Sequence, residues 1–109
     1  MNDRDRERLE QAAISARIAI DYIRTAGKGW RDDLKTIDAT VKRIEDVGEN
    51  LGKVSRELRA ATPNIDWKPA VGMRTHLVHN YINVDLDVLE TTVQNDLPRL
   101  ITEIEAALG

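Results

Sequence analysis

The stretch LKTIDATVKRIEDVGENLGKVSREL, residues 34–58, decides the fold class of this chain. Its apolar and small residues recur at alternating steps of three and four, which places them on one face of an α-helix. The residues on this face are Leu34, Ile37, Val41, Ile44, Gly48, Leu51, Ser55 and Leu58. The pattern predicts a long helix, from about residue 31 to about residue 61, that packs this face against other helices.

Two glycines, Gly48 and Gly52, lie four residues apart within this predicted helix. A glycine inside a helix is less favourable than alanine by about 1 kcal/mol, so the pair needs a reason other than helix formation. We expect another helix or a long side chain to come very close to the backbone at this point. Ordinary tight packing between helices is the alternative explanation.

The residues before this stretch also follow helical spacing. A first helix is predicted over residues 3 to 26, with Asn2 or Asp3 as its N-cap and with Gly27 and Gly29 after its end. Its apolar stripe consists of Leu9, Ala12, Ala13, Ala16, Ile20 and Ile23.

Two further helices are predicted after the long helix that ends at about residue 61. One is expected to start near Trp67, with Asp66 as its N-cap, and to end around Tyr81. The last helix is expected to follow Asp85 and to contain Pro98, which predicts a kink in this helix. Because alternating strand-like stretches with glycine turns are missing, the chain is predicted to be all-α, with four helices.

Length and composition limit the class of protein. With 109 residues and a formal net charge of −3, the chain is predicted to form a single domain over residues 1–109. It has no cysteine, which excludes disulfides, thiolate zinc sites and cysteine nucleophiles. The charged first ten residues and the lack of a long apolar run predict neither a signal peptide nor a membrane span. We therefore expect a cytoplasmic protein with no membrane contact.

The segment MRTHLVHNY, residues 73–81, contains the residues best suited to chemistry. Its spacing, Arg74-x4-His79-x-Tyr81, offers groups that can bind a phosphate, transfer a proton and accept a modification. From Trp67 to Val84 there is no acidic residue, so the segment is predicted to be electropositive and to attract an anionic ligand. Because the whole chain is weakly acidic, any RNA contact is expected to be local and salt-sensitive.

Helix geometry limits how these residues can act together. In one continuous helix, at about 100° per residue, Arg74 and Tyr81 would lie within about 20° of each other and His79 about 140° from Arg74. Metal-free RNA cleavage needs one group to take the 2′-hydroxyl proton, one to protonate the leaving oxygen, and a cation for the phosphorane charge. We therefore favour a composite site in which two motifs face each other across a homodimer axis. An arginine that reaches His79 within one chain is the alternative, and His76 is the rival for the second acid–base role.

Each of these residues also has a simpler interpretation. A histidine on an amphipathic helix is usually a capped or solvated side chain, and Tyr81 can be an amphipathic residue with a wet hydroxyl. His76 and His79 could also be two ligands of a metal, completed by Asp85 or Asp87. The spacing alone does not choose among these interpretations.

Three strings occur in order along the chain: IEDVGENLGKVSREL at 44–58, PNIDW at 63–67, and GMRTHLVHNYINVDLDVLETTVQNDLP at 72–98. Together they resemble the HepT-like branch of the HEPN superfamily, the toxin half of the HepT/MntA toxin–antitoxin pair. The resemblance covers about residues 34 to 108 of the chain.

This resemblance implies an antiparallel helical bundle that dimerises with its motifs together. It implies a metal-independent ribonuclease without a cofactor, acting on RNA such as tRNA or mRNA, in which Arg74 and His79 are the catalytic pair. It also implies a cognate nucleotidyltransferase antitoxin that uses ATP to attach AMP to Tyr81. We expect Glu49 to orient one of the catalytic pair, and further supporting candidates are Lys68, His76 and Asn80.

The chain departs from the branch at two positions. Where the branch commonly has asparagine and then arginine, this chain has Thr75 and His76, which leaves one strong cation fewer. The departure keeps open a second interpretation, a non-catalytic HEPN binding module that partners a nucleotidyltransferase. A third interpretation is a purely structural helical bundle.

Overall fold

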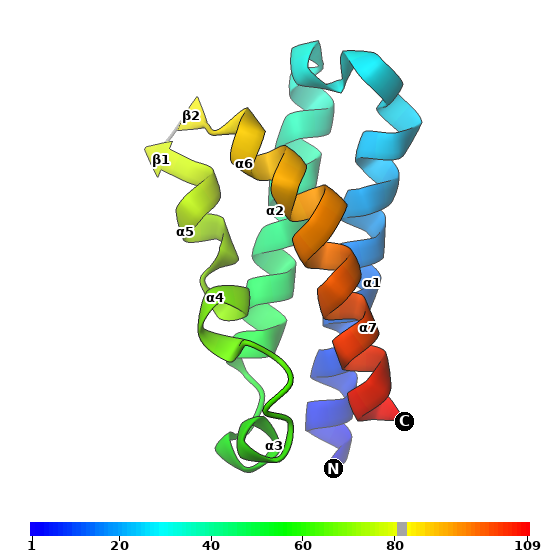
Figure 1. The fold of residues 1–109 in the computed structure, drawn as a ribbon, viewed down its shortest axis with the longest axis vertical. Coiled ribbons are helices and arrows are strands. Elements are labelled where there is room, and N and C mark those ends of the chain that lie inside the picture. The colour runs from blue at the N-terminus through cyan, green and yellow to red at the C-terminus, as the bar shows by residue number, and fades with distance from the viewer. Residues whose placement is uncertain (81–82) are drawn as a thin grey trace.

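The computed structural model describes residues 1–80 and 83–109, with the backbone alone at residues 79 and 80. The chain forms an elongated bundle of 42 × 26 × 19 Å, with both termini at the same end (Figure 1). Four successive helical segments run alternately up and down the bundle, and the later ones are broken into shorter helices. The predicted all-α class and antiparallel bundle are therefore confirmed.

The first helix, α1 (Asp3–Ala26), has the bounds expected from the sequence. Asn2 is its N-cap and accepts a hydrogen bond from the amide of Asp5 at 2.7 Å. Gly27 ends the helix with a φ of 74°, a value that favours glycine. A short 3-10 helix, η1 (Gly27–Asp32), follows and buries Trp30 before the chain turns back.

The long helix predicted to about residue 61 is two helices, α2 (Leu34–Gly52) and α3 (Arg56–Ala61). Ser55 interrupts it: its amide and hydroxyl donate to the two carboxylate oxygens of Asp5, at 3.0 and 2.6 Å. The Ser55 hydroxyl also accepts from the amide of Leu58, which makes it the N-cap of α3. The prediction of one continuous helix was wrong because Asp5, the partner of Ser55, lies on α1, fifty residues away in sequence. Heptad spacing cannot detect such a distant partner.

The helix predicted from Trp67 to Tyr81 is also shorter than expected. It consists of α4 (Trp67–Val71) and α5 (Met73–Leu77), followed by strand β1 (Val78–Asn80). β1 pairs antiparallel with β2 (Asn83–Val84), a small hairpin that the sequence analysis did not expect. The helix stops because β-branched Val78 is extended and the carbonyl of Leu77 accepts from the amide of Asp85 at 2.7 Å, so the chain turns back.

The central helix α2 packs against α1 on one side and against α4 and α5 on the other. At Gly48 the carbonyl oxygen of Val71 comes so close that an added Cβ would lie 2.6 Å from it. At Gly52 an added Cβ would be 3.6 Å from a methyl group of Val71. The close approach predicted from the two glycines is confirmed, and the approaching group is the C-terminal end of α4.

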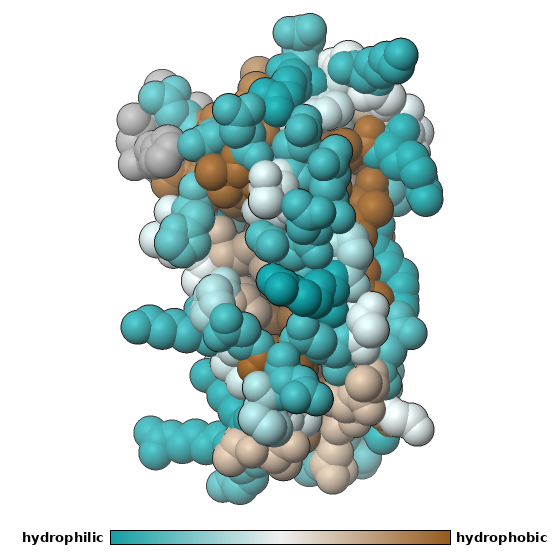
Figure 2. All heavy atoms as spheres, in the orientation of Figure 1, coloured by the Kyte–Doolittle hydropathy of each residue, from teal (hydrophilic) through white to brown (hydrophobic). Residues whose placement is uncertain are grey.

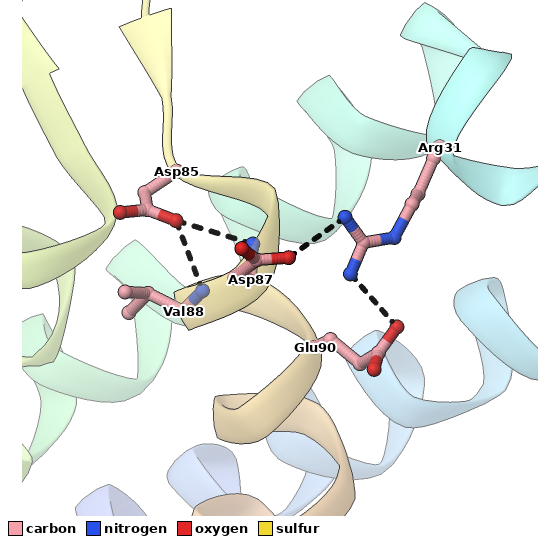
Figure 3. A network of polar contacts seen from close by, with 5 residues as sticks. All are labelled: Arg31, Asp85, Asp87, Val88 and Glu90. Atoms are coloured by element: carbon pink, nitrogen blue, oxygen red, sulfur yellow. Dashed lines mark hydrogen bonds and ion pairs between the residues drawn. The ribbon is translucent and has the colours of Figure 1, made fainter.

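The last helical segment begins at Asp85 as predicted. Asp85 accepts from the amides of Asp87 and Val88, both at 3.1 Å, and so caps α6 (Leu86–Thr91) (Figure 3). A π-helical turn, η2 (Thr92–Asp96), separates α6 from α7 (Leu97–Leu108). Pro98 lies in the first turn of α7. A kink was expected at this proline, and the structure has the wider π-helical turn η2 just before it instead.

One apolar core runs through the bundle between the helices. Small side chains on α1, chiefly alanines, let it lie close to α2, while leucine and isoleucine side chains from α2, α6 and α7 fill the interior. The largest fully buried apolar side chains are Leu9, Ile44, Leu51, Leu77, Leu89, Leu97, Ile104 and Val47. Figure 2 shows that the viewed face is mostly hydrophilic, with apolar side chains visible in separate patches.

Candidate functional site

Arg74 lies on α5 with its guanidinium group beside α2. Its Nε atom is 3.0 Å from Oε1 of Glu45, in the middle of α2. The Arg74 side chain is 50% exposed and the Glu45 side chain 32%, so Glu45 is the more buried partner of a surface ion pair. The close packing of α4 on Gly48 holds the start of α5 against α2 and so brings Arg74 within reach of Glu45.

Two shallow hollows meet at this ion pair, and Glu45 and Arg74 line both of them. The first hollow lies between α2 and the two short helices, and its other lining residues are Ile44, Gly48, Glu49, Val71 and Thr75. The second opens toward the hairpin, and its other lining residues are Leu34, Asp38, Val41, Lys42, Val78 and Val84. We call the two hollows together the Arg74 groove.

The Arg74 groove carries both signs of charge. Its carboxylates are Asp38, Glu45 and Glu49, all on α2, and its cations are Lys42 and Arg74. The segment around the motif contains no acid in sequence, but the fold lays the acidic side chains of α2 beside it. The prediction of a simply electropositive site therefore needs correction: Arg74 enters the groove already paired with a carboxylate.

The other members of the motif follow α5. The backbone of His79 and of Asn80 belongs to β1, so the helical angles that would relate His79 to Arg74 do not apply. Tyr81, the predicted modification site, lies outside the described residues. The prediction that Arg74 and Tyr81 share one face of a continuous helix is wrong, because the helix ends at Leu77.

The second histidine of the chain lies in a different place. His76 is exposed and lines a groove of about 390 Å³ between α4–α5 and α6–α7, together with Met73, Asp96 and Leu100. The residues that line this groove do not include Arg74. Lys68 is exposed on α4 and lines neither this groove nor the Arg74 groove. The fold therefore does not bring these two supporting candidates to Arg74.

Glu49, expected to orient one of the catalytic pair, lines the Arg74 groove. The ion pair with Arg74, however, is made by Glu45, one helical turn earlier on α2. Sequence reasoning missed Glu45, although a signal was present: Glu45, Gly48 and Gly52 follow helical spacing, so the glycines that admit α4 share a side of α2 with this carboxylate.

Elsewhere, Arg31 of η1 holds the start of α6 through ion pairs with Asp87 at 2.9 Å and Glu90 at 3.0 Å (Figure 3). Hydrogen bonds to the carboxylates of Glu90 and Asp87 raise the pKa of Arg31 above its already high value, so this tether stays charged. It fixes the start of α6, which follows β2, the strand that pairs with β1.

The described part of the site supplies a half-exposed guanidinium beside a carboxylate, in a groove that opens toward the strand bearing His79. A guanidinium in such a position can bind a phosphate oxygen and stabilise added negative charge. In the part of the chain that the structure describes, no helix combines the length and apolar character needed to cross a membrane.

Comparison with known proteins finds a family and relatives that are described as ribonucleases. The family described as ribonuclease HepT-like matches residues 12–107. A Thermococcus cleftensis protein named "Probable ribonuclease HepT" is 34% identical over 73 residues, which is 67% of this chain and 66% of that protein. A Methanocaldococcus jannaschii protein, named as a putative RNase, is 33% identical over 67 residues, 62% of each chain.

The matched part of the chain spans less than two thirds of the length of each of these relatives. No solved structure matches the chain. The family match nevertheless covers both halves of the bundle, from α1 to α7, and includes the whole of the Arg74 groove. The chain belongs to the ribonuclease HepT-like family of HEPN proteins.

Proposed function

We propose that this chain is a metal-independent ribonuclease that cleaves RNA with Arg74 and His79. The observation that carries the proposal is the family match over residues 12–107, which contains both motif residues. The relatives named as ribonucleases support the same reaction class. The half-exposed guanidinium of Arg74, in a groove open to solvent, is consistent with a phosphate-binding role.

The proposed reaction is an in-line attack within the RNA. A base removes the proton of a 2′-hydroxyl, whose oxygen forms a bond to the adjacent phosphorus, and the bond from phosphorus to the 5′-oxygen breaks. An acid protonates that leaving oxygen, so the products are a cyclic 2′,3′-phosphate and a 5′-hydroxyl. His79 is the proposed acid or base, because imidazole is the side-chain group that can both take and give a proton near neutral pH. Arg74 would stabilise the phosphorane charge.

One His79 cannot be acid and base in the same turnover, so the proposal includes a homodimer. Two motifs across a two-fold axis would supply two imidazoles and two guanidinium groups to one composite site. The mixed charge of the Arg74 groove is compatible with this arrangement, because a carboxylate beside each Arg74 reduces the repulsion between the two arginines.

The proposal also includes regulation as the toxin of a toxin–antitoxin pair. A nucleotidyltransferase antitoxin would transfer AMP from ATP to the hydroxyl of Tyr81, releasing pyrophosphate. The added phosphate, two residues from His79, would offer Arg74 an intramolecular anion and would exclude the scissile phosphate.

The decisive experiment is cleavage of end-labelled tRNA in EDTA by the purified, unmodified protein. The chain has only two histidines, so His76→Ala is a matched comparison for His79→Ala. We expect wild type and His76→Ala to cleave and His79→Ala to be inactive, with circular dichroism and gel filtration showing that all three fold alike.

The fragment ends would report the chemistry, since a cyclic phosphate and a 5′-hydroxyl are expected. If wild-type protein with an unmodified Tyr81, verified by intact mass, cleaves no RNA, the ribonuclease proposal fails. That result would favour a non-catalytic module that binds a nucleotidyltransferase.

Control by modification is tested separately with Tyr81→Phe. We expect the variant to cleave RNA but to gain no AMP when it is incubated with the cognate nucleotidyltransferase and ATP, and to remain toxic beside it. If the antitoxin restrains Tyr81→Phe as strongly as it restrains wild type, modification of Tyr81 is not the main control.

A further inference from the structure

Arg74 has a defined partner that the proposed chemistry does not use. The closest contact of the ion pair joins Oε1 of Glu45 to Nε of Arg74, at 3.0 Å, and not to either terminal nitrogen. An ion pair at Nε restricts the long side chain of an arginine, and the two terminal nitrogens are not the atoms in closest contact. Those two nitrogens are the pair that can bind two oxygens of one phosphate.

The surroundings of Glu45 restrict it more than those of Arg74. Its side chain is about two-thirds buried, in a turn of α2 that has buried Ile44 on one side and Gly48 on the other. Both hollows of the Arg74 groove include this carboxylate. Glu45 is therefore the less exposed partner and lies on the central helix, and Arg74 is the more exposed group that it contacts.

The stability that such a pair adds is small. Ion pairs at this degree of exposure typically contribute about 0.2–1 kcal/mol, because solvent screens the charges and the side chains lose freedom. A structural role for Glu45 would therefore be hard to detect in unfolding experiments. A positioning role would have a large effect, because misplacing a catalytic group by about 1 Å can reduce a rate by about 100-fold.

We propose that Glu45 is a positioning residue that orients Arg74 toward the scissile phosphate. The inference rests on the proposed ribonuclease function and assigns to Glu45 the role that the sequence led us to expect of Glu49. Glu45 touches neither RNA nor the reacting atoms in this scheme. It acts by keeping the guanidinium in one orientation while substrate binds.

The test compares Glu45→Ala with Asp46→Ala in single-turnover cleavage of the same RNA. Asp46 is the next residue on α2 and pairs with Lys42 and Arg43 instead, so its substitution removes an equal charge without touching Arg74. Simple electrostatics predicts that either change strengthens RNA binding, since each removes a negative charge. Positioning predicts that Glu45→Ala alone lowers the maximal rate, by about 10- to 100-fold, with little change in the RNA concentration at half-maximal rate.

A double-mutant cycle with Arg74→Ala separates positioning from any other effect of Glu45. If Glu45 acts through Arg74, adding Glu45→Ala to Arg74→Ala has no further effect on the rate. A Glu45→Ala protein as active as Asp46→Ala, or losses that add in the double variant, would overturn the inference and leave the ribonuclease proposal standing.

A readout without RNA keeps the two proposals apart. The Nε–H bond of Arg74 should be more ordered in wild type than in Glu45→Ala, as seen by nitrogen-15 relaxation of the arginine side chains. Equal order in the two proteins would contradict the positioning role. If wild type cleaves no RNA at all, the ribonuclease proposal fails by itself, and the relaxation measurement still decides whether Glu45 orders Arg74.

Discussion

At the scale of single residues, Gly48 shows how one missing side chain positions a site. The backbone of α4 occupies the space that a Cβ would need, and this contact places α5, and with it Arg74, against α2. Alanine is the better helix former, so local propensity and tertiary packing make opposite demands at this position. Packing decides the residue here. A Cβ added at Gly48 would lie 2.6 Å from the carbonyl oxygen of Val71, and this oxygen cannot move without moving α4.

Gly48→Ala and Gly52→Ala form a matched pair that tests this statement. We expect Gly48→Ala to destabilise the protein by about 1–3 kcal/mol, because the added methyl group overpacks a contact with backbone. Gly52→Ala meets only a methyl group at ordinary van der Waals distance, so it should be neutral or stabilising by about 0.4–1 kcal/mol. Urea unfolding of both variants measures the difference, and equal effects would show that the close approach does not control stability.

At the scale of elements, the junction between α2 and α3 depends on a contact with the first turn of α1. Asp5 is 4% exposed and accepts from both the hydroxyl and the amide of Ser55, which fixes the N-cap of α3. The hydroxyl of Ser55, and then its amide, lower the pKa of Asp5 below its ordinary value. Arg59 completes the junction by donating to the carbonyls of Leu51 and Gly52 at the end of α2.

The lowered pKa makes this contact sensitive to acid. Because the folded-state pKa of Asp5 lies below the unfolded value of about 3.9, its stabilising effect is complete above that value and is lost as the pH falls through the folded-state pKa. We expect Asp5→Asn to reduce the free energy of unfolding at pH 7 by about 1.5–3 kcal/mol. Urea unfolding of both proteins at pH 7 and at pH 3 should show the difference shrinking in acid. A difference that is the same at both pH values would mean that the charge of Asp5 is unimportant.

A second prediction at this scale concerns the tether from η1 to α6. Arg31 pairs with Asp87 and Glu90 on α6 (Figure 3). It also lies over the ring of Trp30, with its guanidinium carbon 5.1 Å from the ring centre. Arg31→Ala should speed amide hydrogen exchange in the first turn of α6 more than elsewhere, because these contacts hold that turn. Arg24→Ala is the control, since Arg24 pairs with Asp21 within α1 and joins no two elements. Equal exchange in α6 in the two variants would show that Arg31 is not a tether.

At the scale of the whole molecule, the proposed composite site makes activity depend on chain association. In a composite site that needs both copies of the motif, a dimer of one wild-type and one His79→Ala chain is inactive. Adding excess His79→Ala protein to wild type, with time to exchange subunits, should therefore lower cleavage well below that of wild type alone. An equal excess of Asp46→Ala should not lower it, because both motifs are intact. Unchanged cleavage in the presence of His79→Ala would show that each chain acts by itself.

Much of this fold follows from local patterns in the sequence. The bounds of α1, the capping roles of Asn2 and Asp85 and the all-α class depend on contacts between neighbours in sequence, so spacing and capping chemistry predict them. The closeness of another element to Gly48 was also predictable, because glycine inside a helix is otherwise unfavourable. The family resemblance of the motif segment likewise needed no coordinates, and the match over residues 12–107 confirms it.

The tertiary structure decided the breaks and the partners. α2 ends before Ser55 because Asp5 binds that residue, and α5 ends at Leu77 because Asp85 turns the chain back. Arg74 is paired with Glu45 and separated from the groove of His76 because α5 lies between α2 and the last helical segment. The roles of Arg74, His79 and Tyr81 stay predictions. These features depend on groups far apart in sequence, whose distances are set only when the helices pack, so helical spacing could not predict them.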